Sequence, residues 1–202
     1  LSGAPPAYGL LPPGLVRVGG ADAPDFRPDW AGQGRPARLD KAAALLRQAG
    51  YGPRNPLRFE MRFNSSPDHR RICAAAAAMW ADLGVEARLF NTESALHFDA
   101  LRRADFALAR SGWIADLAAP ENFLENFLSD AGDRNYSRYA SAKFDAAMAD
   151  ALSHADADTR ARAMLKAEGV MMADTPILPI YYYVARSLVH PRVAGWHSNP
   201  MN

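Results

Sequence analysis

Three side chains of complementary chemistry lie within seven residues of the chain: Arg110, Trp113 and Asp116. They offer a cation, a flat apolar surface and an anion, a set that suits a zwitterionic ligand with an apolar body. An Arg and an Asp this close more often form an ordinary ion pair, and a Trp beside them is more often part of a core. The three residues therefore define a candidate site that depends on the elements around it.

The elements on either side predict a loop that follows a strand. The apolar run Phe106–Ala109 ends in Arg110 and is typical of a short strand buried on both faces. Ser111 and Gly112 break the run, and Pro120 precedes a helix with an apolar side. That side consists of Phe123, Leu124, Phe127 and Leu128. In open α/β sheets, loops after the carboxyl ends of strands carry ligands, which favours the binding interpretation.

The preceding residues predict a parallel sheet with crossover helices. Apolar residues alternate with charged ones over 57–63 and again over 85–89, which predicts two strands. Between them, Ser66 and Pro67 begin a helix that Gly84 ends, and a helix over 96–103 leads to the strand at Phe106. The expected buried face of the first helix is Ile72, Ala75, Met79 and Leu83. A further helix is predicted from an N-cap at Asp40 to Gly50, with Ala42, Leu45, Leu46 and Ala49 as its apolar face.

The two ends of the chain differ from this pattern. Residues 1–36 contain seven prolines, which predicts an extended strap whose Tyr8, Leu10, Leu11 and Leu15 lie on the folded body. Beyond the polar stretch 129–141, two helices are predicted from the spacing of apolar residues. The first helix carries Phe144, Met148 and Leu152, and the second, after Asp158, carries Ala163, Ala167 and Met171. A strand is expected over 180–184, where three consecutive tyrosines must alternate faces.

Composition excludes several classes of protein. The net charge of +1 offers no field that would attract nucleic acid or anionic lipid. The longest apolar run, Ile72–Ala81, is about half the length of a transmembrane helix, and no secretion signal begins at Leu1. The single cysteine, Cys73, forms no internal disulfide and is expected to be buried as a small apolar residue.

Signatures of catalysis and of metal binding are absent from the sequence. No glycine-rich phosphate loop, no paired histidines at helical spacing and no glycine-flanked nucleophilic serine occur. The five histidines are scattered, and the acidic pair Asp156 and Asp158 is explained by helix capping. We therefore expect a protein that is not an enzyme and needs no cofactor or metal.

Several strings of this sequence carry a resemblance to a known family. They are PAYGLLPPG, FNSSPDHRR, LGVEARLFN, DFALARSGWIAD, NYSRYASAKFD and LPIYYYV, of which ARSGWIAD and PIYYYV are the specific ones. Over nearly its whole length the chain resembles the C-terminal lobe of the oligopeptide- and dipeptide-binding proteins of ABC transporters, the family 5 solute-binding proteins. The resemblance implies an α/β fold of the type II periplasmic-binding-protein class, with a parallel or mixed sheet flanked by helices and a Pro-rich N-terminal strap.

The resemblance also implies a division of the chain. Residues 1–202 would form one C-terminal lobe, with a strap at 1–39, an α/β body at 40–184 and a segment at 185–202 that returns toward a missing N-terminal lobe. The expected location is the periplasm, with a signal peptide upstream of these residues. The expected partners are a short peptide ligand, the membrane subunits of an ABC permease and the missing lobe, and no nucleic acid.

The implied ligand-binding residues include the three from which the candidate site was built. Asp116 would pair with the α-ammonium of a peptide, and Arg110 with its carboxylate end for some peptide lengths. Gly112, Trp113 and Ile114 match the segment along which the peptide lies extended. Further residues implied near the ligand are Arg102, Asn135 and Tyr183.

Departures from the family pattern leave the ligand open. Ser94 occupies a position where relatives often carry a tryptophan that lines a side-chain pocket, and Leu117, Ala118 and Ala119 are less polar than expected. A second interpretation is the ligand-sensing lobe of a transcriptional regulator, and a third is a receptor for a different amine-bearing or chelate ligand. What precedes Leu1 in the gene distinguishes a receptor, with a signal peptide and a first lobe, from a regulator with a DNA-binding domain.

Overall fold

The computed structural model describes residues 3–184 and 187–197, which divide into two compact units. Asp29–Gly112 form the first, which we call the sheet unit, and the described residues before 29 and after 112 form the second, the helical unit. Of the helices in these residues, none combines the length and the hydropathy that a transmembrane span requires.

The sheet unit is a three-stranded parallel sheet with three helices. Its elements in chain order are α1 (Arg35–Gln48), β3 (Leu57–Asn64), α2 (Pro67–Ala81), β4 (Val85–Thr92), α3 (Ser94–Arg102) and β5 (Leu108–Ala109). The strand order is β4-β3-β5, and β3 and β4 pair in register from Leu57 opposite Val85 to Asn64 opposite Thr92. The predicted strand–helix–strand unit with parallel pairing is therefore confirmed.

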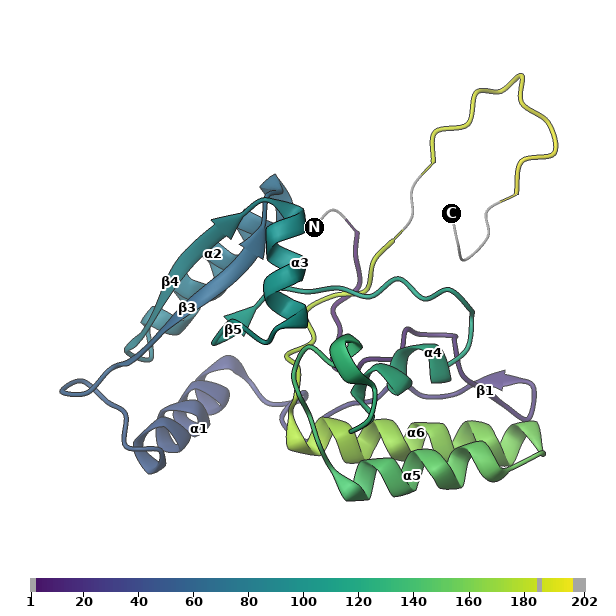
Figure 1. Cartoon of the computed structure of the whole chain (residues 1–202), viewed down its shortest axis with the longest axis horizontal. Coiled ribbons are helices and arrows are strands. Elements are labelled where there is room, and N and C mark those ends of the chain that lie inside the picture. Colours follow the sequence, from purple (N-terminus) through teal and green to yellow (C-terminus); the bar gives the residue numbers. More distant parts are fainter. Residues whose placement is uncertain (1–2, 185–186, 198–202) are drawn as a thin grey trace. The chain divides into compact units, whose positions relative to one another are not determined.

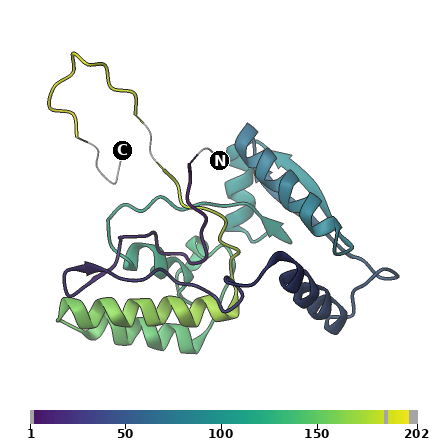
Figure 2. The ribbon, with the colours of Figure 1, turned by 180° about the vertical axis from the view of Figure 1, so that it is seen from behind.

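Helix α2 covers one face of β3 and β4, as Figures 1 and 2 show from opposite sides. Alternation in β3 brings Met61 and Phe63 into a small core with Cys73, which is buried as predicted. The ring of Trp80 packs on Phe59 at a centroid distance of 5.9 Å. Gly84 adopts φ of 74° after α2, a conformation that favours glycine over residues with a Cβ.

The helical unit is built on a pair of adjacent helices, α5 (Ala142–Ser153) and α6 (Ala157–Asp174), which lie side by side in Figure 1. The other elements are the hairpin β1 (Arg17–Val18) and β2 (Ala21–Asp22), helix α4 (Glu121–Leu124), and the 3-10 turns η1 (Glu125–Phe127) and η2 (Gly132–Arg134). Asp156 caps α6 by accepting a hydrogen bond from the N–H of Thr159 at 2.8 Å, which confirms capping as its role.

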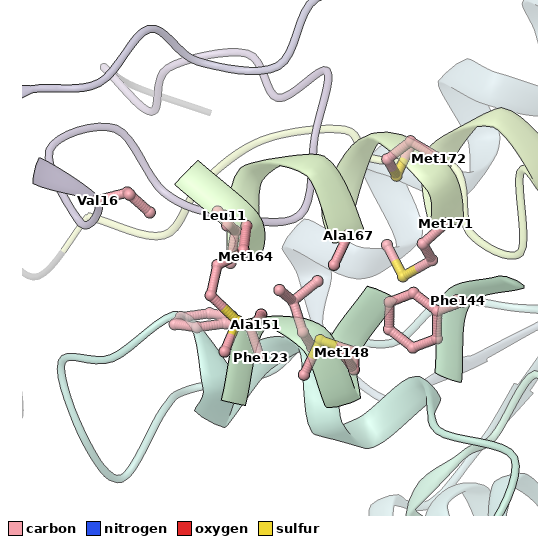
Figure 3. Close-up of a cluster of buried hydrophobic side chains, with 12 residues drawn as sticks. Leu11, Val16, Phe123, Phe144, Met148, Ala151, Met164, Ala167, Met171 and Met172 are labelled. Carbon is pink, nitrogen blue, oxygen red and sulfur yellow. The ribbon is translucent and has the colours of Figure 1, made fainter. Parts of the chain in front are cut away.

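The core of the helical unit lies where α5, α6 and α4 meet the N-terminal strap (Figure 3). Phe144, Met148, Met164 and Met171 are fully buried there. Leu11 is buried in the same cluster, and Leu10 and Leu15 pack against it, so the prediction that the strap lies on the folded body is confirmed.

The buried carboxylate of Glu168 in α6 fixes the strap. Its Oε1 accepts hydrogen bonds from the N–H groups of Leu10 and Leu11 at 2.7 and 2.8 Å. The strap also meets the segment with the three tyrosines, because Pro6 forms an antiparallel bridge with Tyr181 and the Tyr182 hydroxyl donates to the carbonyl oxygen of Gly9 at 3.1 Å.

Three helix predictions are corrected by the structure. Helix α1 begins at Arg35 and not after a cap at Asp40, because Pro36 fits the first turn and the extended Gly34 precedes it. None of its residues is buried, and Leu45 is 55% exposed, so the predicted apolar face enters no core among the described residues.

In α2 the face that packs on the sheet is Cys73, Ala76, Ala77 and Trp80, and not the face with Ala75 and Met79, which are exposed. The run of alanines has no period of its own, so the contact of Trp80 with Phe59 decides which face is buried. In α5, similarly, Ala151 is buried where Leu152 was expected.

Two strand predictions are also corrected. The run Phe106–Ala109 contributes only two residues to the sheet, as an edge strand whose residues are half-buried. Residues 180–184 form a single bridge at Tyr181 and no strand, because the neighbouring Pro179 and the facing Pro5 and Pro6 have no N–H to donate. Of the predicted C-terminal segment, residues 185–186 and 198–202 lie outside the described residues.

Candidate ligand-binding site

The residues that the sequence predicts as ligand-binding divide between the two units. Arg102, Arg110 and Gly112 belong to the sheet unit. Trp113, Ile114, Asp116, Asn135 and Tyr183 belong to the helical unit.

Asp116 lies on the loop that leads into α4, and this loop is held in place by contacts with the helical unit. The N–H of Asp116 donates to the side-chain oxygen of Asn122 in α4 at 2.9 Å, and Ala115 packs against the core of the helical unit. The two side chains that precede Ala115 are exposed, Trp113 by 36% and Ile114 by 72%. The loop is therefore anchored through its backbone and Ala115, while its large apolar side chains and its acid remain accessible.

The carboxylate of Asp116 is exposed, and within residues 3–184 and 187–197 it forms neither a hydrogen bond nor an ion pair. An exposed carboxylate beside an accessible indole and an isoleucine side chain can accept hydrogen bonds from a cationic group while the ligand's apolar part covers the rings. The ordinary ion pair considered for Asp116 in the sequence is thus not formed in the described residues.

Arg110 follows β5 at the carboxyl edge of the sheet, and its backbone is held on both sides. Its N–H donates to the carbonyl oxygen of Arg62 at 2.7 Å, and its own carbonyl oxygen accepts a hydrogen bond from Nε2 of His97 at 2.9 Å. Its positive charge affects His69 in the first turn of α2. Burial lowers the pKa of His69, and the Arg110 guanidinium lowers it further. A hydrogen bond between His69 and the backbone of Asn64 raises the same pKa and so opposes both effects.

His69 and His97 are therefore neighbours of Arg110 that the sequence interpretation did not include in the site. His69 follows the strand end in FNSSPDH, at the start of α2, which is a signal that sequence alone provides. His97 is in the middle of α3, and no sequence pattern connects it with Arg110.

The other predicted residues have different surroundings. Asn135 is 4% exposed, and its amide donates to the carbonyl oxygens of Leu128 and Tyr139 at 3.2 and 2.7 Å. Its oxygen accepts from Ser137 and from the N–H of Tyr139, so its hydrogen-bonding groups serve the 128–139 loop itself.

Arg102 ends α3, about half exposed, at 3.9 Å from Asp99. Tyr183 is half exposed, and its ring meets Tyr181 edge-on at 5.3 Å. The Tyr182 hydroxyl instead points to Gly9, so the three tyrosines alternate as predicted. Within the described part of the chain, no group of three His, Cys, Asp or Glu residues could hold a metal ion.

Comparison with known proteins assigns the family. Residues 2–135 match the middle region of the bacterial extracellular solute-binding proteins, family 5. The chain belongs to this family. It is 36% identical over 192 residues to the periplasmic oligopeptide-binding protein OppA of Escherichia coli, and 33% identical over 160 residues to the periplasmic murein peptide-binding protein MppA of the same organism.

These alignments cover 95% and 79% of this chain but only 34% and 30% of the two relatives, so the chain spans about a third of their length. Among solved structures, the complex of Haemophilus influenzae OppA with RPPGFSPFR superimposes with a TM-score of 0.81 at 31% identity, over 90% of this chain and 35% of that one. The predicted α/β fold with a parallel sheet, of the periplasmic-binding-protein class, is thereby confirmed.

Proposed function

We propose that this chain is the C-terminal lobe of a solute-binding protein that binds short peptides between two lobes and delivers them to an ABC permease. The observation that carries the proposal is the exposed carboxylate of Asp116, on a loop fixed by Asn122 and beside the accessible side chains of Trp113 and Ile114. The names of the relatives, which are binding proteins for oligopeptides and murein peptides, support it.

Asp116 anchors the peptide by accepting charge-assisted hydrogen bonds from its free α-ammonium. Such a bond gains strength as the site closes and water leaves, because a carboxylate and an ammonium attract each other more in a low dielectric. Gly112, Trp113 and Ile114 offer backbone groups to an extended peptide, which gives affinity without reading its side chains.

Arg110 receives the carboxylate end of peptides of suitable length. His69 lies close enough for its pKa to be lowered by the Arg110 charge, and a bound carboxylate would oppose that effect. Arg102 and Tyr183 contribute accessible polar groups at the margins of the ligand-binding site. Asn135 acts indirectly, because its side chain shapes the loop in which Tyr136 lies.

The remaining parts of the proposal concern the protein as a whole. The chain acts by binding and not by catalysis, and its partners are the permease subunits and an N-terminal lobe outside these residues. It acts in the periplasm, to which a signal peptide upstream of these residues directs it. The strap before α1 and residues 180–184 meet at Pro6 and Tyr181. We place these two segments nearest the crossings to the other lobe.

Mass spectrometry and calorimetry on the two-lobed protein test the proposal. The purified protein should release short peptides on denaturation, and Asp116→Ala should weaken peptide binding by roughly 2–5 kcal/mol, as for loss of a buried charge partner. Asp130→Ala, which removes another exposed carboxylate of the helical unit, should leave the affinity unchanged. A protein that carries no peptide, or an Asp116→Ala variant with unchanged affinity, would contradict the proposal.

A further inference from the structure

His97 is a fully buried histidine whose two ring nitrogens differ in environment. The residue is 0% exposed in α3, and its Nε2 lies 2.9 Å from the carbonyl oxygen of Arg110. A carbonyl oxygen only accepts hydrogen bonds, so Nε2 carries the hydrogen and donates it. Nδ1 is also buried and has no hydrogen-bond partner in the described residues, so the bond to Arg110 is the one hydrogen bond of the ring there.

This hydrogen bond acts where the sheet ends and the candidate ligand loop begins. Strand β5 has only two residues, with Leu108 opposite Met61 and Ala109 opposite Arg62. The N–H of Arg110 adds one more bond to the carbonyl oxygen of Arg62 at 2.7 Å. The carbonyl of Arg110 then turns to His97, so this residue is held from β3 on one side and from α3 on the other.

The charges around the ring keep it in the donating, neutral form. Burial lowers the pKa of His97 most, and the cationic groups of Arg110, Arg62 and His69 lower it further, while the hydrogen bond to Arg110 opposes them. A protonated His97 would add a buried positive charge to a region that already contains two arginines. The imidazole therefore serves as a neutral buried donor.

We propose that His97 is a positioning residue for peptide recognition, which fixes the backbone of Arg110 so that its guanidinium meets the carboxylate end of the ligand. This inference rests on the proposed function. It adds a residue of α3, 13 positions before Arg110 in the sequence, to those that determine preference for a free peptide carboxyl group.

The test measures that preference in the two-lobed protein by calorimetry, with one peptide in its free-acid and its C-terminally amidated forms. In the wild type the free acid should bind at least about tenfold more tightly, which is the effect of one charge-assisted hydrogen bond. His97→Leu, which has no donor, should remove most of this ratio. His97→Gln, whose amide N–H can reach the same carbonyl, should retain it.

Two controls separate a positioning role from a general loss of structure. His154→Leu makes the same substitution at a partly exposed histidine that directly follows α5, and it should change neither ratio nor affinity. The ratio between free and N-acetylated peptide depends on Asp116 in the helical unit and should survive in His97→Leu.

The outcomes distinguish this inference from the proposed function. A wild type that prefers the free acid, with a His97→Leu variant that prefers it equally, would overturn the positioning role alone. A wild type that binds no peptide would overturn the proposed function, and the positioning role with it. A wild type that binds peptides but does not distinguish acid from amide would overturn the role assigned here to Arg110 and His97.

Discussion

Replacing Glu168 by alanine should release the N-terminal strap from helix α6. The Glu168 side chain is 1% exposed, and its Oε1 is the acceptor for the N–H groups of Leu10 and Leu11 at 2.7 and 2.8 Å. Both amides belong to a strap that is otherwise held by Leu11 and Val16 in the core and by the bridge at Pro6.

The magnitude follows from the two amides that lose their acceptor. A buried N–H without a partner costs about 1–3 kcal/mol, so Glu168→Ala should destabilise the strap by roughly 2–6 kcal/mol. Since every 1.4 kcal/mol corresponds to a factor of about ten, hydrogen exchange at Leu10 and Leu11 should accelerate by at least about 30-fold.

Amide hydrogen exchange followed by NMR measures this effect residue by residue. Glu168→Gln keeps an oxygen acceptor and should retain most of the protection at Leu10 and Leu11. Lys166→Ala, an exposed substitution in the same helix, should retain all of it. Unchanged exchange at both amides in Glu168→Ala would refute the conclusion that this carboxylate holds the strap.

The same residue gives a pH dependence with a definite sign. Burial raises the pKa of Glu168 above its usual 4.5, and the hydrogen bonds from Leu11 and Leu10 oppose this only in part. The folded chain therefore binds the carboxyl proton more tightly than the unfolded chain does. The stability that this difference in pKa gives the folded chain is fully present below pH 4.5, and it is lost as the pH rises through the folded pKa of Glu168. In denaturant titrations, Glu168→Gln should abolish this loss of stability.

The remaining predictions concern stability. Gly9→Ala should destabilise the chain by about 1–3 kcal/mol in denaturant titrations, because the added Cβ would lie 2.5 Å from Oε1 of Glu168 and 2.8 Å from the Cβ of Phe26. Gly169→Ala should instead stabilise the chain by about 0.5–1 kcal/mol, because the added Cβ in α6 meets nothing within 4 Å. The pKa values of His69 and His97 are lowered by burial, so stability should fall as the pH drops below their usual 6.5, since the unfolded chain takes up protons first. The measurement uses Glu168→Gln, in which the opposite contribution of Glu168 is absent, and constant stability of this variant between pH 7 and 5.5 would contradict the prediction. Phe144→Ala should cost about 3–5 kcal/mol by the same measurement, because the ring is fully buried.

The parts of the fold that are predictable from sequence are those with a strong local period. The strict alternation in Leu57–Asn64 predicts a strand, and the position of Asp156 predicts a helix cap. The structure contains both. The buried face of α2 is not predictable from the run Ala74–Ala78, because alanines on every side leave the choice to the tertiary contact of Trp80. The two-residue length of β5 depends on how far β3 can pair with it, which is likewise a tertiary property.

Some residues of the candidate site are likewise predictable from sequence, and others are not. Trp113 and Asp116 are candidate ligand-binding residues from sequence alone, because they follow a strand end and a glycine, where open sheets bind ligands. The role proposed for His97 is not accessible from sequence, since its bond to Arg110 depends on the packing of α3 beside the sheet. The buried state of Asn135 has a local signal, because Ser137 and Tyr139 complete a hydrogen-bonded turn around it.

The most direct test of the central claim, that the Asp116 carboxylate receives a peptide's α-ammonium, is a double-mutant cycle on the two-lobed protein. Calorimetry would compare one peptide in free and N-acetylated forms, each with wild type and with Asp116→Asn. We expect acetylation to cost the wild type roughly 2–5 kcal/mol and the variant almost nothing, because each change removes the same ion pair. An acetylation penalty of equal size in both proteins would contradict the account.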